Sequence, residues 1–153
     1  MFLNHISFES ILDKIEGYDL CNIITDLLNS MQTFYISEIF INRILDPIIR
    51  HFYESDDDNK YRNICRIAKN IDSEAISYSN CKFEMAYSYE ELEDHKKAEK
   101  LYKMELKKTP NSSAVLNNLG VIYKNNHEYE KAIQYFEKGI SIFNLESVAC
   151  EEI

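Results

Sequence analysis

Apolar side chains recur every three or four positions through most of this sequence, which is the spacing that places them on one face of an α-helix. Gly17 is expected to stop a first helix and Asp19 to cap the next. Asp46-Pro47 should kink or restart a third helix. The pattern predicts an all-α fold with helices over residues 8–15, 20–31, 36–52, 61–71, 74–91, 96–108, 112–125 and 129–143.

Two stretches of the second half repeat each other at a spacing of 34 residues. Small residues stand against small ones and aromatic residues against aromatic ones: Ala86 with Gly120, Tyr89 with Tyr123, Ala98 with Ala132, and Tyr102 with Phe136. A glycine inside a helix costs about 1 kcal/mol relative to alanine. We therefore expect another helix backbone to pass close to Gly120, with the aromatic rings filling the wider spaces between helices.

These residues resemble the tetratricopeptide repeat family, in which helical hairpins recur every 34 residues. The resemblance covers about residues 79–144 and is carried by Met85, Ala86, Tyr89, Ala98, Tyr102 and Pro110 in one copy, and by Leu116, Leu119, Gly120, Tyr123, Ala132 and Phe136 in the other. The chain departs from the family pattern where Leu116 replaces a frequent Trp and where Glu105 and Gly139 replace a usual Ala. Asn144 replaces the terminal Pro.

The resemblance implies antiparallel helical hairpins stacked as a short right-handed α-solenoid. We expect a single domain over 1–153, with divergent N-terminal helices or a cap over 1–72. The first repeat would span 73–111 and the second 112–146, and 147–153 would begin a capping helix or a truncated third repeat.

The resemblance also implies a concave groove lined by the first helix of each hairpin. The partner-binding residues it predicts are Asn80, Phe83, Glu84, Tyr87, Glu90, Asn117, Asn118, Val121, Lys124 and Asn125. Asn117 and Asn118 would hydrogen-bond an extended peptide, and Phe83 and Tyr87 would pack its side chains or instead pack against the preceding helix. Some family members grip chaperone tails with a carboxylate clamp. Asn118 matches one clamp position, but Phe83 and Tyr87 replace its Lys and Asn, which argues against a clamp here.

Composition narrows the possible functions. Asp and Glu number 26 against 17 Lys and Arg, a net charge of −9. Both halves are acidic, so neither carries the basic footprint of a nucleic-acid-binding protein. The first residues lack a signal peptide, and no apolar run is long enough to cross a membrane. We therefore expect a cytoplasmic protein.

The sequence offers little for catalysis or for metal binding. We expect Cys21, Cys65, Cys81 and Cys150 to be free buried thiols, because they are scattered without metal-ligand spacing. Ser55–Asn59 has several acids but lacks the glycine and the distal glutamate of a calcium loop, so we expect a solvated turn. His95 and His127 fall in predicted turns. No catalytic residue, metal or cofactor is predicted.

The resemblance favours a non-catalytic interaction module, or adaptor, that binds a protein or peptide in its groove. One alternative is a small chaperone for a secreted protein. Another is the peptide-sensing part of a larger regulatory protein. A final hairpin without a cap could also pair with a second copy as a homodimer.

Overall fold

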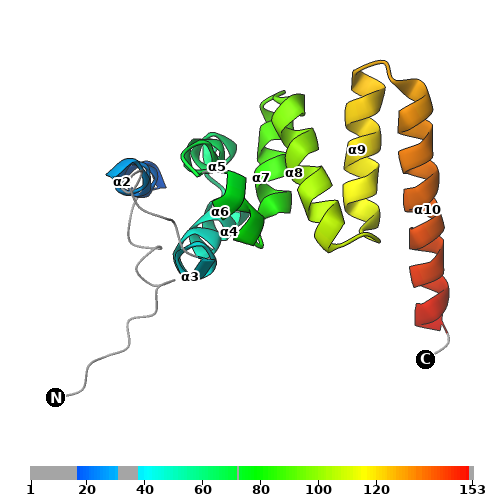
Figure 1. Cartoon of the computed structure of the whole chain (residues 1–153), viewed down its shortest axis with the longest axis horizontal. Helices are drawn as coiled ribbons and strands as arrows, with labels where there is room; N and C mark the ends of the chain where they lie inside the picture. The colour runs from blue at the N-terminus through cyan, green and yellow to red at the C-terminus, as the bar shows by residue number, and fades with distance from the viewer. Residues whose placement is uncertain (1–16, 31–37, 72, 152–153) are drawn as a thin grey trace. The chain divides into compact units, whose positions relative to one another are not determined.

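The computed structural model describes residues 17–30, 38–71 and 73–151, and it describes side chains over 20–29, 38–71 and 73–144 (Figure 1). Helices account for the regular structure of these ranges, which contain no strand, so the predicted all-α class is confirmed. The helix predicted over 8–15 lies outside the described residues. The chain divides into two compact units, Met1–Glu93 (unit 1) and Asp94–Ile153 (unit 2).

Unit 1 is a group of short helices. They are α2 (Gly17–Ser30), α3 (Glu38–Phe40), the π-helical segment η1 (Ile41–Leu45), α4 (Asp46–Glu54), α5 (Lys60–Lys69), α6 (Ser73–Tyr78) and α7 (Lys82–Glu91). Helix α5 packs against α2, α4 and α7. The largest fully buried side chains of this unit are apolar, among them Leu28, Ile41, Leu45, Ile49, Phe52, Ile64, Ile67 and Met85. Burial of these faces is the main force that holds such short helices, because isolated helices of this length are marginal in water.

At Asp46-Pro47, where a kink or a restart was expected, the backbone stays helical and changes from π-helical to α-helical turns. The wider π-helical turns of η1 end at Leu45, and Pro47 occupies the first turn of α4. A proline has no N–H to donate and its ring clashes with the carbonyl four residues earlier, so an early helix position is the one that tolerates it. At the start of α2 the predicted cap was wrong, because Asp19 lies inside this helix, which begins at Gly17. The helix that Gly17 was expected to stop lies outside the described residues.

The helix predicted to run unbroken over 74–91 is in fact two helices, α6 and α7. Residues 79–81 separate them. In this segment the backbone N–H groups of Asn80 and Cys81 donate to side chains instead of to the carbonyls that a continuous helix would offer. The Asn80 N–H donates to Asp46 Oδ2 at 2.8 Å, and the Cys81 N–H donates to Ser79 Oγ at 2.9 Å. Ser79 Oγ in turn donates to Asp46 Oδ1 at 2.6 Å, with both residues buried. Asp46 therefore fixes the break from a different helix.

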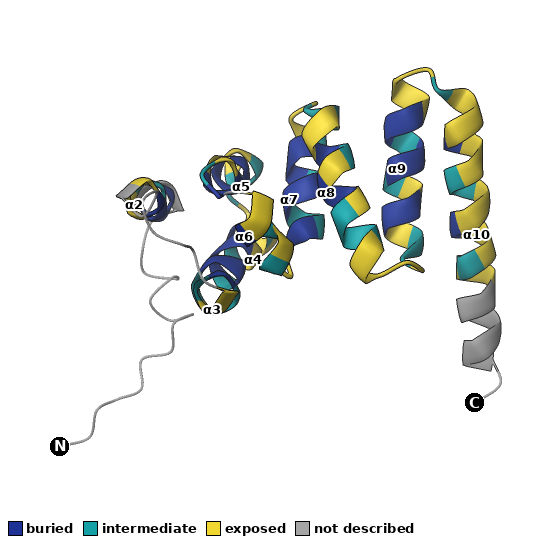
Figure 2. Ribbon diagram, in the orientation of Figure 1, coloured by how far each residue is buried: buried dark blue, intermediate teal, exposed yellow. Residues whose placement is uncertain are grey.

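Unit 2 consists of α8 (His95–Lys108), α9 (Ser113–Asn125) and α10 (Tyr129–Glu151), and α9 packs against both of the others. Figure 2 shows α9 buried along much of its length. Asp94 caps α8 by accepting from the Lys97 N–H, and Ser112 caps α9 by accepting from the Val115 N–H. Pro110 follows the end of α8, as predicted. Helix α10 runs unbroken to Glu151, so no separate helix begins near 147.

The alternation of small and large residues is present in the structure. Most of the repeat residues are buried: Ala86, Tyr89, Ala98, Tyr102, Leu119, Gly120, Tyr123 and Ala132. The reason expected for Gly120 was wrong in one respect. A Cβ built there would lie 2.6 Å from Cε1 of Phe136, so an aromatic ring fills the space, rather than a helix backbone. A backbone does approach Gly139, whose added Cβ would lie 3.5 Å from the Ser113 carbonyl oxygen.

Candidate functional site

In unit 1, two of the predicted partner-binding residues belong to a group of rings from three helices. We call this group the aromatic cluster: Tyr53 on α4, Tyr61 on α5, and Phe83 and Tyr87 on α7. Tyr87 lies at its centre, with ring centroids 5.9 Å from Tyr53, 5.8 Å from Tyr61 and 6.4 Å from Phe83. Tyr87 thus packs against earlier helices, which was one of the two expected outcomes. All four rings are nonetheless only half-buried and keep some contact with solvent.

Carboxylates surround this cluster and act on its tyrosines. A hydrogen bond to Glu91, together with burial, raises the pKa of Tyr87 to about 12. Burial raises the pKa of Tyr53, and the nearby Tyr61, Glu84 and Glu91 raise it further. The neutral hydroxyl form is therefore favoured at Tyr87 chiefly by the bond to Glu91, and at Tyr53 chiefly by burial, with nearby carboxylates adding to both effects.

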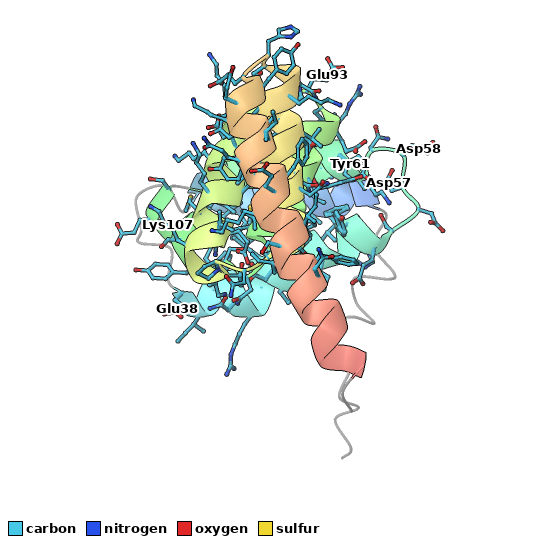
Figure 3. The ribbon with its side chains drawn as sticks, turned by 90° about the vertical axis from the view of Figure 1, so that its right-hand side faces the viewer. Glu38, Asp57, Asp58, Tyr61, Glu93 and Lys107 are labelled. Atoms are coloured by element: carbon cyan, nitrogen blue, oxygen red, sulfur yellow. The ribbon has the colours of Figure 1, made fainter. Side chains whose placement is uncertain are left out.

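The loop between α4 and α5 lies beside the same rings and is acidic. Figure 3 shows Tyr61, Asp57 and Asp58 on one side of the molecule. Asp57 accepts from the Asn59 N–H at 2.8 Å and from Asn63 Nδ2 at 3.1 Å, an arrangement that orders the turn at the start of α5. The predicted solvated turn at Ser55–Asn59 is confirmed. Its carboxylates interact favourably with the partial positive charge at the N-terminus of α5.

The other predicted residues of unit 1 differ in role. Besides its backbone bond to Asp46, Asn80 donates through Nδ2 to Asn42 Oδ1 at 2.8 Å, so it holds the junction of α6 and α7. Glu84 and Glu90 are half-buried on α7. Next to this junction, burial and the carboxylates of Asp46 and Glu84 raise the pKa of the Cys81 thiol to about 12.

In unit 2, the two adjacent asparagines of α9 have separate roles. Asn118 Nδ2 donates to the Tyr102 hydroxyl of α8 at 2.8 Å. Asn117 is exposed and lines a pocket on the α10 side. Neighbouring helix positions point about 100° apart, so the two amides do not form the expected pair. Val121 is half-buried, and Lys124 and Asn125 are exposed.

The pocket beside Asn117 has a volume of about 390 Å³ and is mostly apolar. Its lining residues are Ser113, Ala114 and Asn117 of α9 with Phe136, Gly139, Ile140 and Phe143 of α10. Four large apolar side chains of α10 are more than half exposed: Tyr129, Ile133, Ile140 and Phe143. We call these four residues the apolar edge of α10.

Sequence reasoning missed Tyr53 and Tyr61 as members of the candidate site. Tyr61 begins one predicted helix and Tyr53 directly follows another, and the chain contains 11 tyrosines. Nothing in their spacing indicates convergence, because the rings come together only when α4, α5 and α7 pack.

Other candidate chemistry is limited. Within the ranges that the structure describes, no group of three or more His, Cys, Asp or Glu could hold a metal ion. Cys21, Cys65 and Cys81 are buried thiols that form no disulfide, as expected, and the side chain of Cys150 lies outside the described residues. His127 Nδ1 lies 2.9 Å from the Tyr129 hydroxyl in an exposed turn. Among the described helices, none combines the length and apolar character needed to cross a bilayer.

The comparisons with known proteins bear on unit 2. No curated protein matches the chain. Residues 113–143 match the family model described as Tetratricopeptide repeat. The matched segment contains α9 and most of α10, and it is the second of the two copies identified in the sequence. The resemblance to the tetratricopeptide repeat is therefore supported for this helical hairpin.

Proposed function

We propose that this chain is a non-catalytic interaction module, an adaptor that binds a peptide or protein segment. The observation that carries the proposal is the tetratricopeptide match over the α9–α10 hairpin. Such repeats present helix faces to partners and typically do no chemistry themselves. The partner would be a protein, and each unit would contribute its own contacts.

The contacts we propose follow from exposure. Phe83 and Tyr87 present half-buried rings that can pack apolar side chains of a partner. Asn117 and Lys124 are exposed on α9, and the Asn117 amide can pair with a peptide backbone. Asn118 does not belong to these contacts, because its amide bonds the Tyr102 hydroxyl.

The test is affinity capture with the full chain as bait in a native lysate, followed by mass spectrometry. A double variant, Phe83→Ala with Tyr87→Ala, and a single variant, Asn117→Ala, are run in parallel. We expect a reproducible set of proteins with the wild-type bait that the double variant loses. His127→Ala, in an exposed turn, is the control bait. If the wild-type bait enriches nothing over an unrelated helical protein, the proposal fails.

A chaperone for a secreted protein is the second candidate, and the apolar edge of α10 is the observation that favours it. Exposed apolar surface next to a pocket is suited to hold an apolar client segment. The test is light scattering of an aggregating apolar client with and without the chain. Ile133→Ser, Ile140→Ser and Phe143→Ser together should remove any protection while the double variant Phe83→Ala with Tyr87→Ala keeps it. Equal protection by all three proteins would exclude this role for the edge.

A further inference from the structure

We propose that the aromatic cluster of unit 1 binds arginine side chains of a basic partner segment. This inference rests on the proposed function, because it assigns a chemical class to the partner that Phe83 and Tyr87 contact. It extends that function by adding Tyr53 and Tyr61 to the binding surface and by naming the cation.

The first argument is geometric. Rings from α4, α5 and α7 meet around Tyr87, and their packing fixes how the rings are oriented. Each ring is half-buried, so part of it remains available to a ligand. The face of an aromatic ring is electrically negative and attracts cations within about 6 Å of its centroid. Lys60 Nζ lies 5.5 Å from the Tyr61 centroid, within the distance of such a contact.

The second argument is the local charge. Glu84 and Glu91 stand next to the cluster, close enough to act on the hydroxyl groups of Tyr53 and Tyr87. Asp57 and Asp58 lie on the same side as Tyr61 (Figure 3). A cation placed over these rings would therefore meet carboxylates as well as ring faces, and the two attractions add.

The third argument is the distribution of charge along the chain. Unit 1 contains 17 acidic and 8 basic residues, and unit 2 contains 9 of each, so the whole net charge of −9 belongs to unit 1. A field of one sign attracts ligands of the opposite sign and speeds their association. The negative charge of unit 1, which contains the aromatic cluster, thus favours a basic partner.

Arginine fits this surface better than lysine. Its guanidinium group is planar, weakly hydrated and able to stack on a ring while it bonds a carboxylate through two N–H groups. A lysine ammonium is a compact, strongly hydrated charge and gains less from a ring face. The same surface should therefore rank an arginine peptide above a lysine peptide, and both above a neutral analogue.

The test is fluorescence anisotropy with the full chain and three labelled peptides. In each peptide, glycine alternates with four copies of one other residue: arginine, lysine or citrulline. Citrulline is the neutral analogue of arginine. We expect the arginine peptide to bind at least about tenfold more tightly than the citrulline peptide, with affinity falling as salt increases. The lysine peptide should fall between them.

Variants locate the site. Tyr87→Leu removes the central ring and should weaken arginine-peptide binding about three- to tenfold, the range of one cation–ring contact. Glu84→Gln with Glu91→Gln should weaken it by a similar factor while leaving the helix surface almost unchanged. Glu38→Gln is the matched control, because this exposed carboxylate lies in the same unit on the opposite side from Tyr61 (Figure 3). Circular dichroism confirms that each variant is folded.

Two results would overturn the inference. One is equal binding of the arginine and citrulline peptides. The other is an equal loss of arginine-peptide affinity in the Glu38→Gln variant and in the Glu84→Gln, Glu91→Gln variant. That result would indicate that the peptide responds to the net charge of the unit and not to a defined site. Lysate capture separates this outcome from failure of the proposed function. Partners that depend on Phe83 and Tyr87 would keep the adaptor role even if the arginine peptide did not bind.

Discussion

Glu93 and His127 lie 34 residues apart and share one backbone conformation, with φ of 60° and 62°. Among the described non-glycine residues, these two alone have positive φ. Each stands in the turn that follows a helix, α7 for Glu93 and α9 for His127. The Glu93 N–H donates to the Glu90 carbonyl as the His127 N–H donates to that of Lys124. The repeat seen in the side chains is thus also present in the backbone.

Glycine at either turn should stabilise the protein. An L-residue in the left-handed region costs about 1–2 kcal/mol, and glycine avoids this cost but has a more flexible unfolded state. We expect Glu93→Gly and His127→Gly each to raise the free energy of unfolding by about 0.5–1 kcal/mol. Urea unfolding followed by circular dichroism measures the change. Leu92→Gly, at a φ of −96°, is the control and should destabilise instead.

The two glycines of the α9–α10 hairpin should respond in opposite ways to alanine. At Gly139 a new Cβ would lie 3.5 Å from the Leu116 Cβ, an ordinary contact, so Gly139→Ala should gain about 0.5–1 kcal/mol from helix propensity. At Gly120 the new Cβ would lie 2.6 Å from the Phe136 ring, so Gly120→Ala should lose about 1–3 kcal/mol through overpacking. Thermal unfolding of both variants tests the contrast.

A double-mutant cycle isolates the cause at Gly120. Phe136→Ala removes the ring, so in that background Gly120→Ala should become neutral or stabilising. If Gly120→Ala costs the same with and without the ring, another contact is responsible for the small residue at this position.

The sequence predicted α8 and α9 well because their signals are local. Asp94, Ser112 and Pro110 lie at helix ends, and the spacing of apolar residues defines each helix between them. The break between α6 and α7 could not be predicted in the same way. Its cause is Asp46, which lies 33 residues from Ser79 in the sequence and meets it only in the folded chain.

The residues of the aromatic cluster also differ in whether the sequence could identify them. Phe83 and Tyr87 could be identified from the repeat frame, because the frame assigns a face to every position of a helix. Tyr53 and Tyr61 lie in the part of the chain that the frame does not cover, and only packing brings them to Tyr87.

Asp46 should be among the more sensitive positions of unit 1. Asp46→Ala would leave the buried Ser79 hydroxyl and the Asn80 N–H without their acceptor, and each unsatisfied group costs about 1–3 kcal/mol. We expect a loss of about 2–4 kcal/mol in urea unfolding. Asp46→Asn keeps one carbonyl acceptor and should lose less. Hydrogen exchange of the amides of 79–82 should quicken in the alanine variant, and unchanged exchange there would contradict the proposed role.

The stability of unit 2 should fall in acid through Glu99. Its Oε1 accepts from the Tyr123 hydroxyl at 2.7 Å and from Lys103 Nζ at 2.5 Å. Burial alone would raise the pKa of Glu99, but these two hydrogen bonds outweigh it and hold the pKa below its ordinary value of 4.5. A pKa lower in the folded than in the unfolded state means that the folded protein binds fewer protons.

The stabilisation from Glu99 is therefore complete above its ordinary pKa and is lost as pH falls through the lower folded value. Asp94 adds to the same trend, because its hydrogen bond with Lys97 lowers its pKa. We expect the urea midpoint to be steady near neutral pH and to fall below about pH 5.

The Glu99→Gln variant should be less stable than the wild type at neutral pH, and its urea midpoint should decline less steeply in acid. Glu137→Gln, which removes an exposed carboxylate from α10, should leave the decline as it is in the wild type. An equal flattening by both variants would show that general charge repulsion, and not the bonds to Tyr123 and Lys103, sets the acid limit.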